Sequence, residues 1–258
     1  MWQAQMMYDV TERMLFVSRV TMSRTRTRTE ERVLQAAKRL FLRFGFDKTT
    51  MDDVAREAGV AKGTLYRYWP SKEALFESLL FRELRAVNED FLTRIESDPA
   101  GGTIGRILYH GFAATYERPF LRALMTTDSR VLGTYLRQRS PELSRWQFRL
   151  DRQLVEELQE AGVLRRDLDP HLLTYLFTVI SLGLSTAAEV VAPELAPPTA
   201  SLTTALADMA QRAFAPEGGG DSERGKEVLR RFITALNQSL ANLERETRIG
   251  SASEGDKT

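Results

Sequence analysis

The stretch that decides the fold is DKTTMDDVAREAGVAKGTLYRYWPSK, residues 47–72. Thr50 and Asp53 have the spacing of a capping box, in which the threonine hydroxyl accepts from a first-turn amide and the acidic side chain reaches back. Gly59 supplies the left-handed residue that a tight turn between two helices requires. The stretch therefore predicts a short helix, a turn and a second short helix: a helix-turn-helix.

The two short helices are expected to bury one side and expose the other. Helical spacing turns Leu65 and Trp69 toward the core. The apolar residues around the turn pack inward in the same way: Met51, Val54, Ala55, Ala58 and Val60.

The outward side of the second short helix carries Lys62, Gly63, Tyr66 and Arg67. Two cations, a tyrosine and a glycine that permits close backbone approach suit the major groove of DNA and its flanking phosphates. Arg67 has the geometry to bind guanine bidentately. The alternative interpretation is an ordinary solvated helix face.

Composition excludes several classes of protein. The 258 residues are 43% hydrophobic, enough for a proper core, and contain no cysteine, so neither disulfides nor a thiolate metal site is expected. His110 and His171 lie too far apart in sequence to predict a metal site, and no cofactor motif is present. The absence of cysteine suits a cytoplasmic protein.

Neither a signal peptide nor a membrane span is predicted. Arg13 and Arg19 bracket only a short apolar run at residues 14–17. The longest uncharged stretch, residues 172–188, contains five Ser/Thr residues and falls short of the roughly 20 apolar residues that a spanning helix needs.

Charge is unevenly distributed along the chain. Residues 1–70 carry a net charge of +5, whereas the remaining residues carry −4. A basic head on an acidic body favours nucleic-acid binding by the head, because phosphate contacts dominate such affinity.

Apolar residues recur at helical intervals throughout, which predicts an all-α protein. We expect a first helix over 29–44 that ends at Gly45 and a long helix after the N-cap Ser71 to about Ser97. The expected helices beyond the break at 98–102 are 103–117, 119–138, 141–161, 170–191, 199–214 and 224–247.

The expected domains are an N-terminal three-helix DNA-binding domain and a larger helical body. Their bounds are a flexible basic extension over 1–26, the helix-turn-helix domain over 27–80, an effector-binding and dimerisation domain over 81–248, and a disordered tail over 249–258. Residues 1–21 are either an extension or the product of a misassigned start.

Residues 29–80 resemble the N-terminal domain of the TetR family of transcriptional regulators. The resemblance rests on Phe44-Gly45, on Thr49-Thr50, and on the run VAKGTLY from Val60 to Tyr66, continuing to Lys72. It covers about a fifth of the chain. Ala61, Arg67 and Tyr68 depart from the residues that are common in the family at those positions.

The resemblance implies how the head meets double-stranded DNA. Thr50 and Lys72 would hold phosphates on either side, and the groove would be lined by Lys62, Gly63, Thr64, Tyr66, Arg67 and Tyr68. Arg24, Arg26 and Arg28 form either a basic arm along the minor groove or a solvated mobile tail.

The family resemblance also implies a homodimer on a palindromic operator with half-sites about one turn apart. The last two long helices are the expected interface. One contributes the apolar segment 172–191, and the other contributes Val228, Phe232, Leu236, Leu240 and Leu243. Burial inside a single chain explains the first segment nearly as well.

The family typically holds a largely apolar ligand cavity in the body. The candidate lining residues are Tyr109, Phe112, Tyr116, Trp146 and Phe177. A small, mostly apolar effector would be oriented by polar groups such as Tyr116 or His110. In most helical proteins such aromatic residues simply form the core.

The function that these patterns favour is a ligand-responsive transcriptional repressor. A transcriptional activator or a ligand-independent regulator of the same fold is the alternative. A helical adaptor that keeps the helix-turn-helix only for packing is a remoter one. An enzyme is disfavoured, because the sequence has neither a glycine-rich phosphate cradle nor a recognisable nucleophile elbow.

Overall fold

The computed structural model describes residues 28–125 and 141–254, and every regular element within them is a helix. This confirms the all-α prediction. Residues 28–44 are helical and precede α2 (Met51–Ala58), α3 (Lys62–Tyr68), α4 (Lys72–Ser97), α5 (Ile104–Tyr116), α6 (Pro119–Met125), α8 (Pro141–Glu160), α9 (Pro170–Val190), the 3₁₀ turn η2 (Pro193–Leu195), α10 (Thr199–Phe214) and α11 (Ser222–Glu254).

Helix ends lie where the capping residues predict them. The Ser71 hydroxyl accepts from the Ala74 amide at the start of α4, and the Asp169 carboxylate accepts from the Leu172 amide at the start of α9. Gly45 and Gly59 adopt positive φ values of 84° and 62°, the left-handed conformation that ends a helix with little strain.

One predicted end differs from the structure, and another lies outside its described part. The helix expected over 119–138 is described only as α6, because residues 126–140 lie outside the described part of the chain, as does the N-cap Ser140. The last helix was expected to end at 247, with a disordered tail from 249, but α11 continues to Glu254. Gly250 therefore lies inside the helix: glycine weakens a helix by about 1 kcal/mol relative to alanine but does not by itself end it.

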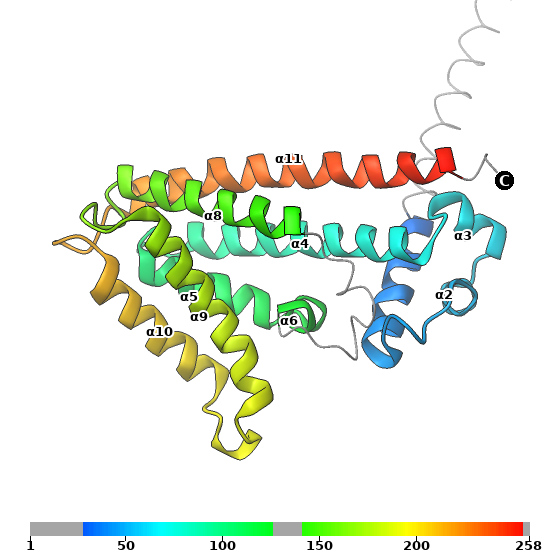
Figure 1. Cartoon of the computed structure of the whole chain (residues 1–258), viewed down its shortest axis with the longest axis horizontal. Helices are drawn as coiled ribbons and strands as arrows, with labels where there is room; N and C mark the ends of the chain where they lie inside the picture. The colour runs from blue at the N-terminus through cyan, green and yellow to red at the C-terminus, as the bar shows by residue number, and fades with distance from the viewer. Residues whose placement is uncertain (1–27, 126–140, 255–258) are drawn as a thin grey trace, which may run out of the picture.

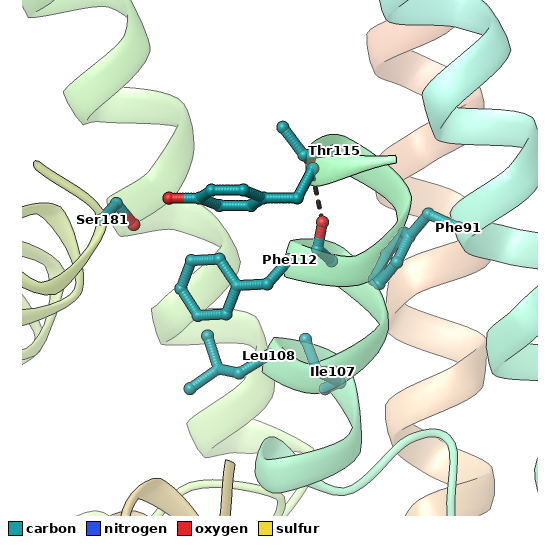
Figure 2. Close-up of a pocket in the computed structure, with 8 residues that line it drawn as sticks. Phe91, Ile107, Leu108, Phe112, Thr115 and Ser181 are labelled. Carbon is teal, nitrogen blue, oxygen red and sulfur yellow. Dashed lines mark hydrogen bonds between the residues drawn. The ribbon is translucent and has the colours of Figure 1, made fainter. Parts of the chain in front are cut away.

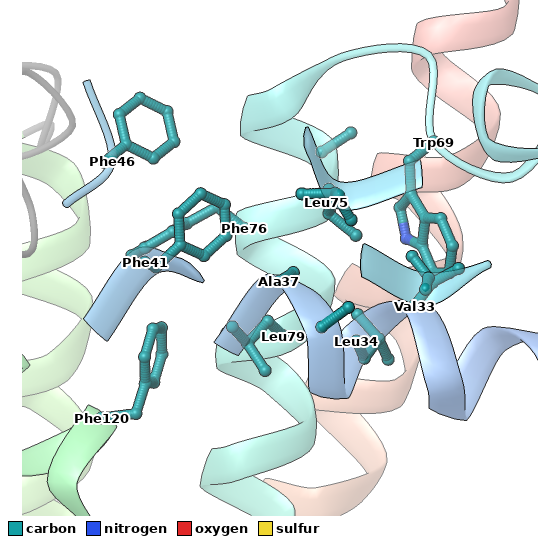
Figure 3. Packing of buried hydrophobic residues seen from close by; sticks show 14 of the residues in the cluster. Val33, Leu34, Ala37, Phe41, Phe46, Trp69, Leu75, Phe76, Leu79 and Phe120 are labelled. Atoms are coloured by element: carbon teal, nitrogen blue, oxygen red, sulfur yellow. The ribbon is translucent and has the colours of Figure 1, made fainter. Parts of the chain in front are cut away.

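The head has a continuous apolar core beneath the helix-turn-helix (Figure 3). Phe41, Phe46 and Phe76 pack with ring centroids 5.3 to 5.7 Å apart, and Trp69 is fully buried nearby. Phe120 of α6 joins this core, 5.3 Å from Phe76. The core of the head thus extends beyond the 27–80 segment that the sequence predicts for it.

α4 connects the head to the body. Its first turns supply Leu75, Phe76 and Leu79 to the head core, and Ile95 near its other end belongs to a second core in the body. In Figure 1, α11 lies along α4, and α5 packs between α4 and α10. Among the described helices, none is both long and apolar enough to cross a membrane.

Candidate nucleic-acid interface and ligand cavity

The helix-turn-helix is held by local hydrogen bonds and by one contact from the first helix. The Thr50 hydroxyl accepts from the Asp53 amide, and Asp53 accepts from the Thr50 amide, so the predicted capping box is confirmed. The hydrogen bonds from Thr50 lower the pKa of Asp53. Arg32 donates to the Gly59 carbonyl at 3.1 Å, which ties the turn to the helix over 28–44.

α3 has the predicted inward and outward faces. Leu65 and Trp69 are fully buried, whereas Lys62, Gly63, Tyr66 and Arg67 are exposed, with Tyr66 at 41%. A Cβ added at Gly63 would meet no atom within 4 Å, so packing inside the chain does not require this glycine. α3 therefore exposes Lys62, Tyr66 and Arg67 on one face, while Leu65 and Trp69 anchor its other face in the core.

A carboxylate lies beside the first cation of this face. The Lys62 ammonium is 2.8 Å and 2.9 Å from the two carboxylate oxygens of Asp52 on α2. The hydrogen bond to Asp52 raises the pKa of Lys62, so this side chain stays charged at neutral pH. Both side chains are more than half exposed, so the ion pair adds little stability and Lys62 can leave it for a phosphate.

The other residues predicted to contact DNA border this face. Thr64 and Tyr68 are half-buried, and the Tyr68 ring packs 5.7 Å from Trp69. Lys72 donates to the Phe46 carbonyl at 2.8 Å, and the Thr50 hydroxyl is engaged in the capping box. Both groups therefore already have partners within the chain.

One residue of the predicted basic arm lies in the described part of the chain and is helical. Arg28 is exposed but helical, so placing it in an unfolded arm is wrong. It lies one position before the expected helix start at 29, within the usual variation of helix ends. Arg24 and Arg26 lie outside the described residues.

An apolar cavity of about 260 Å³ lies between α4, α5 and α9 (Figure 2). It is lined by Phe91, Ile107, Leu108, Gly111, Phe112, Thr115, Tyr116 and Ser181. The described residues that line it include no charged side chain. Thr115 donates its hydroxyl proton to the Gly111 carbonyl, so its oxygen can only accept from a ligand.

The cavity includes some of the predicted lining residues and excludes others. Phe112 and Tyr116 line it, whereas Tyr109 packs against His110, and Phe177 packs against Phe214 in the body core. The side chain of Trp146 lies outside the described part of the structure. His110, suggested as a polar contact for a ligand, is instead buried beside Asp98.

Sequence reasoning missed most of the α5 wall of the cavity. Leu108, Phe112 and Thr115 recur at helical intervals, so the periodicity of α5 could have identified this face. Phe91 and Ser181 come from α4 and α9, and no local pattern indicates that these helices meet α5.

The corner between α5 and α6 joins the cavity to α4. Thr115 and Tyr116 of the cavity are followed directly by Glu117 and Arg118. The Arg94 guanidinium of α4 binds the Glu117 carboxylate, and the hydrogen bonds to Glu117 and Asp90 raise its pKa. Arg118 donates to the Ala86 carbonyl of α4 at 3.0 Å.

An exposed helix on a buried helix-turn-helix scaffold, carried by a larger helical body, is an arrangement typical of DNA-binding proteins. Residues 33–79 match the family model of bacterial regulatory proteins of the tetR family. The head of this chain is therefore similar to the N-terminal domain of the TetR family.

Curated relatives resemble mainly the head. The chain is 37% identical over 68 residues to an uncharacterised helix-turn-helix transcriptional regulator of Mycobacterium bovis, Mb2274c, covering 26% of this chain and 36% of the relative. It is 37% identical over 71 residues to the regulator EthR of Mycolicibacterium smegmatis, covering 28% and 33%. The alignments thus span about a third of these relatives.

Solved structures share the fold over most of their length. The fatty acid degradation regulator FadR of Bacillus halodurans superposes with a TM-score of 0.54 at 18% identity, covering 70% of this chain and 93% of FadR. SmeT, the repressor of a Stenotrophomonas maltophilia multidrug efflux pump, superposes with a TM-score of 0.52 at 24% identity, covering 75% and 93%. The fold shared with these structures therefore extends into the body.

Proposed function

We propose that this protein is a homodimeric repressor that binds a palindromic operator and leaves it when a small, mostly apolar effector occupies the cavity. One observation carries the proposal. α4 supplies Phe91 to the cavity wall and Leu75, Phe76 and Leu79 to the core of the head. A ligand that displaces Phe91 would therefore move α4, the helix that carries the DNA-binding head.

The proposed operator contacts follow from the exposed face of α3. Lys62 and Arg67 supply positive charge, Tyr66 supplies an exposed ring, and Gly63 allows the backbone to approach the duplex. Thr50, Thr64, Tyr68 and Lys72 border this face and are proposed to hold the flanking backbone, with Arg26 and Arg28 contributing general attraction.

The proposed dimer interface is the open face of α9. Leu172, Tyr175, Leu176 and Val179 are 36 to 58% exposed and follow one another at helical spacing. An exposed apolar stripe of this length marks an interaction surface. A second copy of the chain fits this surface, because a two-fold operator requires two heads.

Two residues of α11 that were predicted to lie in the dimer interface are buried within the single chain. Val228 and Leu240 were expected to form part of the interface stripe, but they are 4% and 5% exposed within the single chain. α11 uses this side to pack inside its own subunit, so these two residues are not available to a partner.

The cavity favours an uncharged effector of modest size. Its volume is slightly below the range of about 300 to 1,000 Å³ typical of drug-sized ligands. Nearby charged groups on α4 and the α5–α6 corner are paired with one another, as Arg94 is with Glu117. By thermodynamic linkage, effector and operator must weaken each other's binding by the same factor.

The proposal is tested by selecting bound sequences from random duplex DNA with the purified protein, with and without a pool of neutral apolar metabolites. We expect a palindromic sequence with half-sites about one helical turn apart and release of DNA by some members of the pool. A selection that yields no enriched sequence would refute operator binding. Enrichment of single half-sites would refute the dimeric arrangement, and operator binding that no member weakens would count against the effector.

A further inference from the structure

Helix α11 lies along α4 and is attached to it by polar contacts from its body end to its middle. At the body end, the Ser222 hydroxyl donates to the Pro99 carbonyl just beyond α4 and accepts from the Gly102 amide. Further along, Arg230 binds Glu96 at 2.7 Å. In Figure 1 the two helices remain side by side toward the head.

Two more contacts lie near the middle of α4, closer to the head than Glu96. The Asn88 amide of α4 donates to the Asn237 side-chain oxygen of α11 at 2.7 Å. One turn closer to the head, Arg85 of α4 is 2.7 Å from Glu244 of α11, and these side chains are only 27% and 15% exposed. An ion pair this shielded constrains its two helices more than a surface pair does.

The same stretch of α4 is bound to the head. Glu83 lies two residues before Arg85, and its almost buried carboxylate is 2.7 Å from Lys38 of the helix over 28–44. Arg82 lies beside Glu83, at 3.6 Å. Ion pairs thus connect the head to α4, and α4 to α11, within about one helical turn.

We propose that Asn237 and Glu244 of α11 are positioning residues for the DNA-binding head. α11 acts as a brace that holds the middle of α4, and with it the head that α4 carries, in one position relative to the body. The head's orientation then depends on these contacts. The effect on DNA binding rests on the proposed function, whereas the effect on head position does not.

Alternative roles for this part of α11 predict different results. If Glu244 only stabilises the fold, its loss lowers the free energy of unfolding and leaves the position of the head unchanged. If α11 positions the head, loss of the pair broadens the distribution of head-to-body distances at temperatures where the protein is fully folded.

The distance between the head and the body can be measured with labels on introduced cysteines, because the chain contains no cysteine of its own. Lys48 in the head and Ala213 on α10 are both exposed, so Lys48→Cys and Ala213→Cys can carry one spin label each. Pulsed electron resonance on labelled protein diluted with unlabelled protein gives the distance distribution within one subunit. Binding to the duplex selected by the unmodified protein is measured in parallel.

We expect Arg85→Glu and Glu244→Arg each to broaden the distance distribution. If the competent orientation falls to a tenth of the population, affinity for the operator falls roughly tenfold. The double reversal, Arg85→Glu with Glu244→Arg, restores the charge pairing and should narrow the distribution again. Asn237→Ala provides a milder test, because it removes a hydrogen bond without introducing a charge.

The matched control reverses Arg152 and Glu156, an exposed pair on α8. Distance distributions that stay unchanged in both single reversals and in Asn237→Ala, or that change no more than in the control, would overturn the proposal. If the unmodified protein binds no duplex, the proposed function fails, and the distances alone decide whether α11 is a brace.

Discussion

Nε2 of His110 lies 2.8 Å from Oδ2 of Asp98, the residue that ends α4. Arg106 donates to the same oxygen, and both partners are on α5. This cluster joins the end of α4 to the helix that forms most of the cavity wall. Burial raises the pKa of Asp98, but the hydrogen bonds from His110 and Arg106 outweigh it and lower the pKa to about 2.

The lowered pKa of Asp98 predicts a specific pH dependence of stability. Because the carboxylate has a lower pKa in the folded state than in the unfolded state, its contribution is complete above about pH 5 and is lost as the pH falls toward 2. We expect this contribution to be about 1 kcal/mol after allowance for solvent screening. Urea unfolding of the wild type and Asp98→Asn at several pH values checks it. A stability difference that stays constant down to pH 2 would contradict the assignment.

The position of Phe120 predicts that the stability of the head depends on a residue of the body. Its ring is fully buried in the head core against Phe76, although it belongs to α6. Phe120→Ala should lower the free energy of unfolding by about 3 to 5 kcal/mol, the usual cost of deleting a buried phenylalanine ring. Phe120→Leu is the matched control, because it keeps most of the apolar volume. Equal unfolding midpoints for the two variants would show that the ring does not fill the head core.

The exposed face of α3 predicts two separable effects on DNA binding. Lys62→Ala should weaken binding to all duplexes and reduce the salt dependence by about one counterion, because a phosphate contact is lost. Arg67→Ala should relax the preference at one base position, with a loss of about 1 to 3 kcal/mol of discrimination. Titrations against the selected duplex and single-base variants at several salt concentrations distinguish the two. Tyr66→Ala is expected to abolish a detectable shift while the protein stays folded.

The titrations test the proposed DNA contacts of α3 only if the variants keep their fold. Circular dichroism and the oligomeric state of each variant serve as controls. Normal DNA binding by all three variants would show that the surface that contacts DNA lies elsewhere on the molecule.

Short-range rules predicted the local structure well, because capping and turn formation depend on residues a few positions apart. The spacing of Thr50 and Asp53 fixes the start of α2, and Ser71 and Asp169 begin their helices as expected. The outward position of Lys62 and Arg67 follows from Leu65 and Trp69 facing inward. Most of the candidate DNA-binding face could therefore be derived from one segment.

Contacts between distant segments could not be predicted in the same way. Phe120 has the same apolar character as any core residue, and nothing in its neighbourhood indicates that it packs against Phe76. The cavity requires Phe91, Phe112 and Ser181 to converge from three helices. Val228 and Leu240 were assigned to a dimer interface because an apolar stripe does not specify which neighbour covers it.

Glycine substitutions provide a test of how tightly α11 is seated on the body. A Cβ at Gly225 of α11 would lie 2.1 Å from the Gly102 carbonyl oxygen, which is backbone and cannot rotate away. Gly225→Ala should therefore push α11 from the α4–α5 turn and cost about 1 to 3 kcal/mol, the range for overpacking. A Cβ at Gly111 of α5 would meet only Phe91, at 3.8 Å, an ordinary contact. Gly111→Ala should leave stability unchanged or raise it by up to about 1 kcal/mol, because alanine favours the helix. Chemical denaturation of the two variants measures both effects, and a Gly225→Ala protein as stable as the wild type would mean that α11 is less closely packed at this point than the distance implies.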